Sequence, residues 1–170
     1  SIVFSISATI YGDCEFGLLN ENSIINPVNP YGNTKFTIEK LLNDVFNSSP
    51  NKWRIANLRY FNPIGAHYSG LIGEDCKGQM NNIFPLILEV ASGKRKVLEV
   101  YGNDWPTPDG TCLRDYIHVM DLSEGHIHTL NYLFEDVPKI ININLGTGLG
   151  TSVLELINTF CKINNGDIPY

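Results

Sequence analysis

The sequence predicts an α/β protein built around a parallel sheet. Strand-like runs of β-branched and aromatic residues alternate with stretches of helical period along the 170 residues. With 43% hydrophobic residues, the chain is long enough to bury one substantial core. Alternating strands and helices are typical of β-α-β units, whose strands run parallel and whose crossovers are right-handed.

The first expected β-α-β unit comprises residues 2–7, 30–47 and 54–61. The runs "IVFSIS" (2–7) and "RIANLRYF" (54–61) have the short apolar character of buried strands. Between them, the segment 30–47 has apolar residues at helical spacing, and it begins with Asn29 as N-cap and Pro30 at the first helical position. Its apolar stripe contains Ile38, Leu41, Leu42, Val45 and Phe46.

The middle of the chain is expected to be irregular. Residues 63–80 contain four glycines and no clear period, which predicts a long loop of the functional or mobile kind. A helix should follow in "NNIFPLILEVASGKRK", closed by Gly93. The run "VLEVYG" (97–102) is expected to be a short strand, and the Pro-rich residues 103–115 are expected to form a loop.

The last third should return to regular structure. "YIHVMDLSEGHIHTLNYLF" (116–134) predicts a passage from strand to helix, "IININLG" (140–146) predicts a buried strand, and "SVLELINTFCKI" (152–163) predicts a helix. Residue 1 lies within a strand-like run and "NNGDIPY" follows the last helix without a closing element, so we expect the chain to be an internal piece of a longer protein.

Composition and charge argue against several classes of protein. Twelve basic and 18 acidic residues give a net charge of −6 without a basic stripe, so nucleic acid is not an expected partner. The apolar runs are too short to span a membrane, and the first residues lack the charged start of a signal peptide. The four cysteines (Cys14, Cys76, Cys112, Cys161) show no C-x-x-C pairing, which suits a cytoplasmic protein without a disulfide framework or a zinc site.

The residue pair Tyr31 and Lys35 is the first candidate for chemistry. Residues four apart are neighbours on a helix, and a cation beside a phenol favours the tyrosinate, which could act as a base. The spacing alone also permits a core tyrosine beside a lysine that extends its ammonium group to water. The polar residues that end the expected strands bear on this choice.

Ligands in open parallel sheets lie beyond the carboxyl ends of the strands. Ser5, Ser7 and Thr9 come at the end of the strand at 2–7, and Phe61 and Asn62 end the strand at 54–61. Such residues often only satisfy the main chain of a turn. Together with a Tyr/Lys pair at one edge of one unit, they indicate a binding site.

Five phrases in order resemble the UDP-glucose 4-epimerase family of extended short-chain dehydrogenases/reductases, over almost all 170 residues. They are "FSISATIYGD", "NPYGNTK", "LRYFNPIGAH", "NNIFP" and "YGNDWPTPDGTCLRDYIHVMDL". One departure is Ile6, where the family more often has a third consecutive serine. The resemblance implies the later half of a doubly wound (Rossmann-like) parallel sheet, in residues 1–62 and 116–150. Residues 63–115 and 151–170 would be part of a small α+β substrate-binding domain.

The resemblance also implies the site. Tyr31 would be the base and acid at the sugar 4-hydroxyl, Ser7 would hydrogen-bond the same hydroxyl, and Lys35 would hold the nicotinamide ribose of NAD and favour the tyrosinate. With Phe61, these residues would bind the cofactor. The UDP-sugar would be bound by Asn62, Asn82, Ile83, Glu99, Tyr101 and Arg114.

The implied reaction interconverts UDP-glucose and UDP-galactose in galactose metabolism, by oxidation at C4, rotation of the 4-keto sugar and re-reduction. The full-length protein is expected to be a homodimer, and the 170 residues alone to be inactive. A guanidinium fork suits the diphosphate, although Arg114 could instead pair with Asp115 or another acid.

Two other motifs are not expected to bind ligands. "NLGTGLG" (144–150) resembles a dinucleotide fingerprint but has Thr151 where the third glycine belongs, so we interpret it as a structural turn. His126 and His128 are two residues apart on an expected helix and therefore point in different directions. No metal site is expected.

Two alternative functions share the same residues. A nucleotide-sugar 4,6-dehydratase needs a carboxylic acid after the first strand, where this sequence has Ala8 and Thr9, unless Glu15 or Glu21 reaches the site from the next loop. Another nucleotide-sugar epimerase is also compatible. The non-enzymatic alternative is a silent remnant that binds a nucleotide sugar.

Overall fold

The computed structural model describes residues 1–13, 17–75, 77–78, 80, 82–135 and 137–170. The chain forms two compact units. The first unit is Ser1–Pro63 with Ile117–Gly148, and the second unit is Ile64–Tyr116 with Leu149–Tyr170. Each unit has its own core, and each is described separately below.

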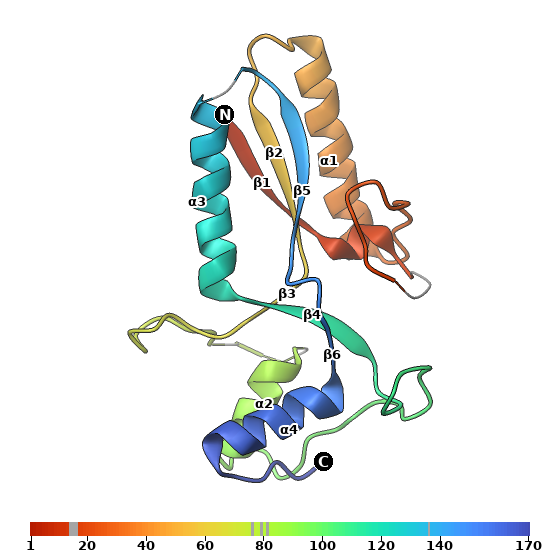
Figure 1. Cartoon of the computed structure of the whole chain (residues 1–170), viewed down its shortest axis with the longest axis vertical. Coiled ribbons are helices and arrows are strands. Elements are labelled where there is room, and N and C mark those ends of the chain that lie inside the picture. The colour runs from red at the N-terminus through yellow and green to blue at the C-terminus, as the bar shows by residue number, and fades with distance from the viewer. Residues whose placement is uncertain (14–16, 76, 79, 81, 136) are drawn as a thin grey trace. The chain divides into compact units, whose positions relative to one another are not determined.

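The first unit contains a three-stranded parallel sheet in the order β1-β2-β5 (Figure 1). Its strands are β1 (Ile2–Ser7), β2 (Ile55–Tyr60) and β5 (Ile140–Leu145). In the register, Ser7 lies opposite Tyr60, and Tyr60 lies opposite Leu145, so the three strands end together at one edge. The predicted β-α-β order and parallel pairing are confirmed.

Two helices pack on this sheet, one on each face (Figure 1). Helix α1 (Pro30–Ser48) joins β1 to β2, and α3 (Val119–Glu135) precedes β5. Side chains of a strand alternate between the two faces. Ala56 and Leu58 of β2 are accordingly buried with Leu133 of α3. The next residue, Arg59, points to the other face and bonds to α1. After β1, the short 3-10 helix η1 (Ala8–Tyr11) continues the chain.

The second unit is organised around two helices, α2 (Ile83–Ala91) and α4 (Val153–Asn164). Six of its side chains form one buried apolar cluster: Ile87, Val90, Leu98, Leu156, Ile157 and Ile168. Strand β4 (Leu113–His118) pairs antiparallel with β6 (Gly150–Ser152). The three-residue strand β3 (Asn62–Ile64) lies where the first unit passes into the second.

Two expectations about the second unit are wrong. Residues 97–102 do not form a strand; Leu98 is buried in the apolar cluster, and its N–H donates to the carbonyl of Pro169 at 2.8 Å. Residues 103–115 are not loop throughout, because β4 begins at Leu113 and pairs with the unexpected β6. Both errors arise where a distant partner in the chain decides the local structure.

Candidate active site

The carboxyl end of β1 carries the first candidate residue. Ser7 is the last residue of the strand and the N-cap of η1, with its side-chain oxygen accepting the N–H of Thr9 at 3.3 Å. Oγ acts as the acceptor in this bond, so the hydroxyl hydrogen of Ser7 remains able to donate. Two residues earlier, the Ser5 hydroxyl hydrogen-bonds Nε2 of His126 at 3.2 Å. Ser5 therefore joins β1 to α3.

The start of α1 is anchored against the turn that follows β1. Asn29 caps the helix as predicted, with Oδ1 accepting the N–H of Gly32 at 2.8 Å. Gly32 is buried, and a Cβ atom there would come within 2.8 Å of the main-chain oxygen of Thr9. Only a glycine permits this close approach, which brings the first turn of α1 to the end of β1.

Lys35 lies one turn after Tyr31 and ties this helix to the strand. Its ammonium group donates to the main-chain oxygen of Ser5 at 3.0 Å and lies 5.6 Å from the centre of the Tyr31 ring. The same ammonium is 5.3 Å from the centre of the Phe4 ring. Tyr31 itself is 53% exposed. The structure thus brings together a positive charge, a phenol that a ligand could reach, and the strand that ends in Ser7.

Phe61 and Asn62 follow directly after β2. The Phe61 N–H donates to the carbonyl of Leu145 at 3.1 Å, which extends the pairing of β2 and β5 by one residue, and its side chain is half-buried. Asn62 is exposed and begins β3. Both residues therefore lie at the edge where the three strands end.

The other predicted site residues are in the second unit. Asn82 is the exposed N-cap residue of α2 and makes no side-chain cap bond, and Ile83 begins that helix. Tyr101 donates to Glu99 at 2.6 Å, and this hydrogen bond raises the pKa of Tyr101. Arg114 is exposed on β4, with Nη1 donating to the carbonyl of Leu113 at 3.0 Å. The substrate-binding role of these five residues remains a prediction.

A buried polar network lies in the first unit and was not predicted from the sequence. Arg59 of β2 and Glu39 of α1 form a two-point ion pair with N–O distances of 3.0 and 2.5 Å, and both side chains are almost wholly buried. Tyr11 accepts a further bond from Arg59 at 2.9 Å. Burial alone would lower the pKa of Arg59, but the bonds to Glu39 and Tyr11 outweigh burial and raise it. A charged residue inside the apolar run "RIANLRYF" was the available signal.

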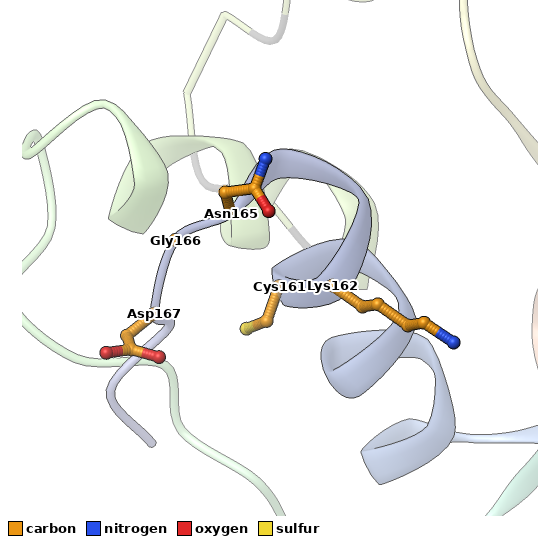
Figure 2. A pocket seen from close by; sticks show the side chains of 5 residues that line it. All are labelled: Cys161, Lys162, Asn165, Gly166 and Asp167. Carbon is orange, nitrogen blue, oxygen red and sulfur yellow. The ribbon is translucent and has the colours of Figure 1, made fainter.

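A further feature of the described chain is a hollow outside the predicted site. The hollow in Figure 2 lies at the end of α4 and is lined by Cys161, Lys162, Asn165, Gly166 and Asp167, none of which was predicted to bind a ligand. Among the described residues, no three His, Cys, Asp or Glu side chains are grouped as metal ligands would be. Within the same part of the chain, each helix is too short or too polar to span a membrane. Glu15, Cys14 and Cys76 lie outside the described residues.

Comparison with known families gives one match that covers most of the chain. Residues 1–144 match the model described as the NAD dependent epimerase/dehydratase family. The UDP-glucose 4-epimerase of Bacillus subtilis (strain 168) is 48% identical over 175 aligned residues, which cover 99% of this chain and 49% of that protein.

Solved structures give the same picture. The UDP-glucose-4-epimerase of Stenotrophomonas maltophila, solved with NAD and formylated UDP-arabinopyranose, superposes with a TM-score of 0.93 at 45% identity, covering 98% of this chain and 49% of that one. The enzyme of Bifidobacterium longum, in complex with NAD+ and UDP, gives 0.92 at 46% identity, covering 99% and 50%. The chain spans about half the length of each of these three relatives.

Proposed function

The chain belongs to the NAD dependent epimerase/dehydratase family, and from this premise we propose that the full-length protein interconverts UDP-glucose and UDP-galactose with NAD as cofactor. One observation carries the proposal. The Lys35 ammonium group lies beside the exposed Tyr31 ring and is bonded to the strand that ends in Ser7. This is the residue set that an alcohol oxidation at a sugar carbon requires: a base, a cation beside it and a hydroxyl donor.

The residues present fit a nicotinamide ribose. An ammonium group has three N–H donors, and in Lys35 one of them is directed to the carbonyl of Ser5. The others can donate to ribose hydroxyls, and the half-buried Phe61 ring lies at the same edge of the sheet. When bound, NAD would accept the hydride from C4 of the sugar and return it to the opposite face.

Proton transfer is the part that we assign to this chain's side chains. Tyr31, as tyrosinate, accepts the proton of the sugar 4-hydroxyl and later returns it to the 4-keto oxygen. Ser7 donates its hydroxyl hydrogen to the same sugar oxygen, because the bond that Oγ accepts from the N–H of Thr9 leaves this hydrogen available. Lys35 stabilises the negative charge on the Tyr31 oxygen by proximity.

Recognition of the nucleotide sugar is assigned to the second group of residues. Arg114 is exposed and carries a fork of N–H donors that matches the oxygens of a diphosphate. Glu99 and Tyr101, already bonded to each other, would border the uracil. The nucleotide sugar would be held by Asn62, Asn82 and Ile83. The first unit would then act as the cofactor-binding domain and the second as part of the substrate-binding domain.

The proposal applies to the full-length protein, because the chain spans about half the length of the relatives above. We expect that protein to be a cytoplasmic homodimer that acts in galactose metabolism. The 170 residues expressed alone should not turn over UDP-galactose. We assign no membrane or nucleic-acid partner.

The nearest competing reaction is a 4,6-dehydration, which also passes through a 4-keto sugar. It needs an acid to protonate the departing 6-hydroxyl. Ala8 and Thr9 follow β1 and cannot supply this proton. Of the two carboxylates considered in the following loop, Glu15 is outside the described residues, and Glu21 accepts the main-chain N–H of Asn144 at 2.8 Å. The absence of an acid at positions 8 and 9, together with the bond that engages Glu21, supports epimerisation over dehydration.

The deciding experiment is a product analysis. The full-length protein is incubated with UDP-glucose and NAD, and the nucleotide sugars are separated and identified. We expect UDP-galactose at an equilibrium ratio. Accumulation of a 4-keto-6-deoxy sugar would show a dehydratase, and a sugar unchanged after long incubation would favour the silent binding remnant.

A further inference from the structure

A single buried guanidinium group holds together the two elements that carry the proposed catalytic residues. Arg59 lies in the central strand β2 and is 2% exposed. Its Nε and Nη2 donate to the two carboxylate oxygens of Glu39 on α1, while Nη1 donates to the hydroxyl of Tyr11 on η1. Glu39 is 3% exposed and Tyr11 is 2% exposed. All three groups therefore lie in the interior of the first unit.

The position of each partner in its element matters. Glu39 is one helical turn beyond Lys35, so it lies on the same face of α1 as Tyr31 and Lys35. Tyr11 ends the 3-10 turn that Ser7 begins as N-cap. Arg59 thus holds the helix of Tyr31 and Lys35 through Glu39, and holds the turn of Ser7 through Tyr11.

The network is also closed on its far side. The Tyr11 hydroxyl donates to Oδ1 of Asn144 at 2.7 Å, which connects the turn to β5. Arg59 Nη1 donates at 3.1 Å to the main-chain oxygen of Glu21, whose carboxylate in turn accepts the N–H of Asn144. A displacement of η1 or α1 would break a charged or fully buried hydrogen bond.

We propose that Arg59, Glu39 and Tyr11 are positioning residues that fix Ser7 relative to the Tyr31–Lys35 pair. The inference rests on the proposed function, since it assigns these three residues to the same reaction. The physical reason is that charged hydrogen bonds are directional. Apolar side chains would fill this interior with similar stability but without directional bonds, whereas a two-point guanidinium–carboxylate pair permits one geometry. None of the three residues contacts the substrate in this assignment.

The test is Tyr11→Phe in the full-length protein, because this change removes one hydroxyl and keeps the ring beside Arg59. The control is Thr129→Val, which removes another buried hydroxyl, bonded to the carbonyl of Gly125 at 2.7 Å in α3. We expect Tyr11→Phe to lower kcat about tenfold at an unchanged KM, because small displacements of reacting groups are costly. Thr129→Val should keep the kcat of the unaltered protein, even if its melting temperature falls as much as that of Tyr11→Phe.

A second variant and a second readout separate positioning from simple stability. Glu39→Asp keeps the charge but shortens the side chain, so we expect kcat to fall while the circular dichroism spectrum stays that of the folded protein. Amide hydrogen exchange in residues 8–11 should accelerate in Tyr11→Phe and not in Thr129→Val. Exchange reports the anchoring of η1 without reference to activity.

The outcomes are distinguishable. If the unaltered protein does not convert UDP-glucose, the proposed function fails and the positioning inference falls with it. If the unaltered protein is active and both Tyr11→Phe and Glu39→Asp retain its kcat, the positioning inference alone is wrong. An equal loss of kcat in Thr129→Val would overturn it as well, because the loss would then reflect general destabilisation.

Discussion

Lys35 places its ammonium nitrogen 5.6 Å from the centre of the Tyr31 ring, one helical turn away along α1. The same nitrogen is 3.0 Å from the main-chain oxygen of Ser5 in β1. The lysine is therefore bound to the sheet and does not extend freely into water. The charge beside the phenol is held in place by the strand, and this makes the pair suitable for proton transfer.

Replacing Tyr31 by phenylalanine tests the proposed base directly. In the full-length protein, Tyr31→Phe should lower kcat for UDP-glucose by about 10²–10⁴-fold, as loss of a general base does, with little change in KM. Steady-state kinetics in both directions would measure this. Tyr132→Phe is the matched control, because Tyr132 also has a lysine, Lys139, 4.5 Å from its ring centre. Full activity of Tyr31→Phe would point to a binding protein instead.

Gly32→Ala tests the close approach of α1 to the turn after β1. Alanine favours a helix over glycine by about 1 kcal/mol, so propensity alone predicts greater stability. The added Cβ would meet the main-chain oxygen of Thr9 at 2.8 Å, which no side-chain rotation relieves. We expect a net loss of about 1–2 kcal/mol, since overpacking costs about 1–3 kcal/mol, together with a lower kcat. Urea unfolding and kinetics would measure the two effects.

Gly125→Ala is the control for this prediction. Its Cβ would lie 3.1 Å from a methyl group of Leu145, which can move by side-chain rotation. We expect Gly125→Ala to keep the kcat of the unaltered protein and to lose less stability than Gly32→Ala. Equal stability of the two variants would contradict the close approach seen at Thr9.

The buried ion pair predicts strong non-additivity. Glu39→Leu alone should lower the free energy of unfolding by about 3–5 kcal/mol, because it leaves the Arg59 charge buried without its partner. The double variant Glu39→Leu/Arg59→Met should lose much less than the sum of the two single losses. Urea unfolding of the four proteins completes the cycle. Additive losses would show that the pair contributes nothing specific.

Asp109 predicts a dependence of stability on pH in the second unit. Its pKa is lowered chiefly by a hydrogen bond from the hydroxyl of Ser152, and further by the N–H and hydroxyl of Thr111. A lowered carboxyl pKa stabilises the fold above the unfolded value of about 3.9, and this contribution is lost as the pH falls through the folded value.

The test is Asp109→Asn. At pH 7 this variant should melt at a lower temperature than the unaltered protein. The difference should begin to shrink below about pH 4 and disappear as the pH falls through the lowered pKa of Asp109, where the folded carboxylate becomes protonated. Thermal melts over a pH series would measure it, with the exposed Asp44→Asn as control. A constant difference at all pH values would rule out the ionised carboxylate as the cause.

The elements with local signals were predictable from the sequence. Asn29 and Pro30 begin α1 as expected, and the apolar runs became β1, β2 and β5 in one parallel sheet. The Tyr31–Lys35 spacing predicted that both residues lie on one helix face, because residues four apart are neighbours on a helix. The proximity of this pair follows from the sequence, whereas the catalytic roles remain predictions.

What the tertiary structure decided are contacts between distant residues. Arg59 meets Glu39 only because the crossover brings α1 over β2, and Tyr11 meets Asn144 across 133 residues of chain. Residues 97–102 have the composition of a strand, yet Leu98 is buried against helices and bonded to Pro169 instead. Period and capping act over one or two turns, whereas burial and pairing depend on partners that only the folded chain brings together.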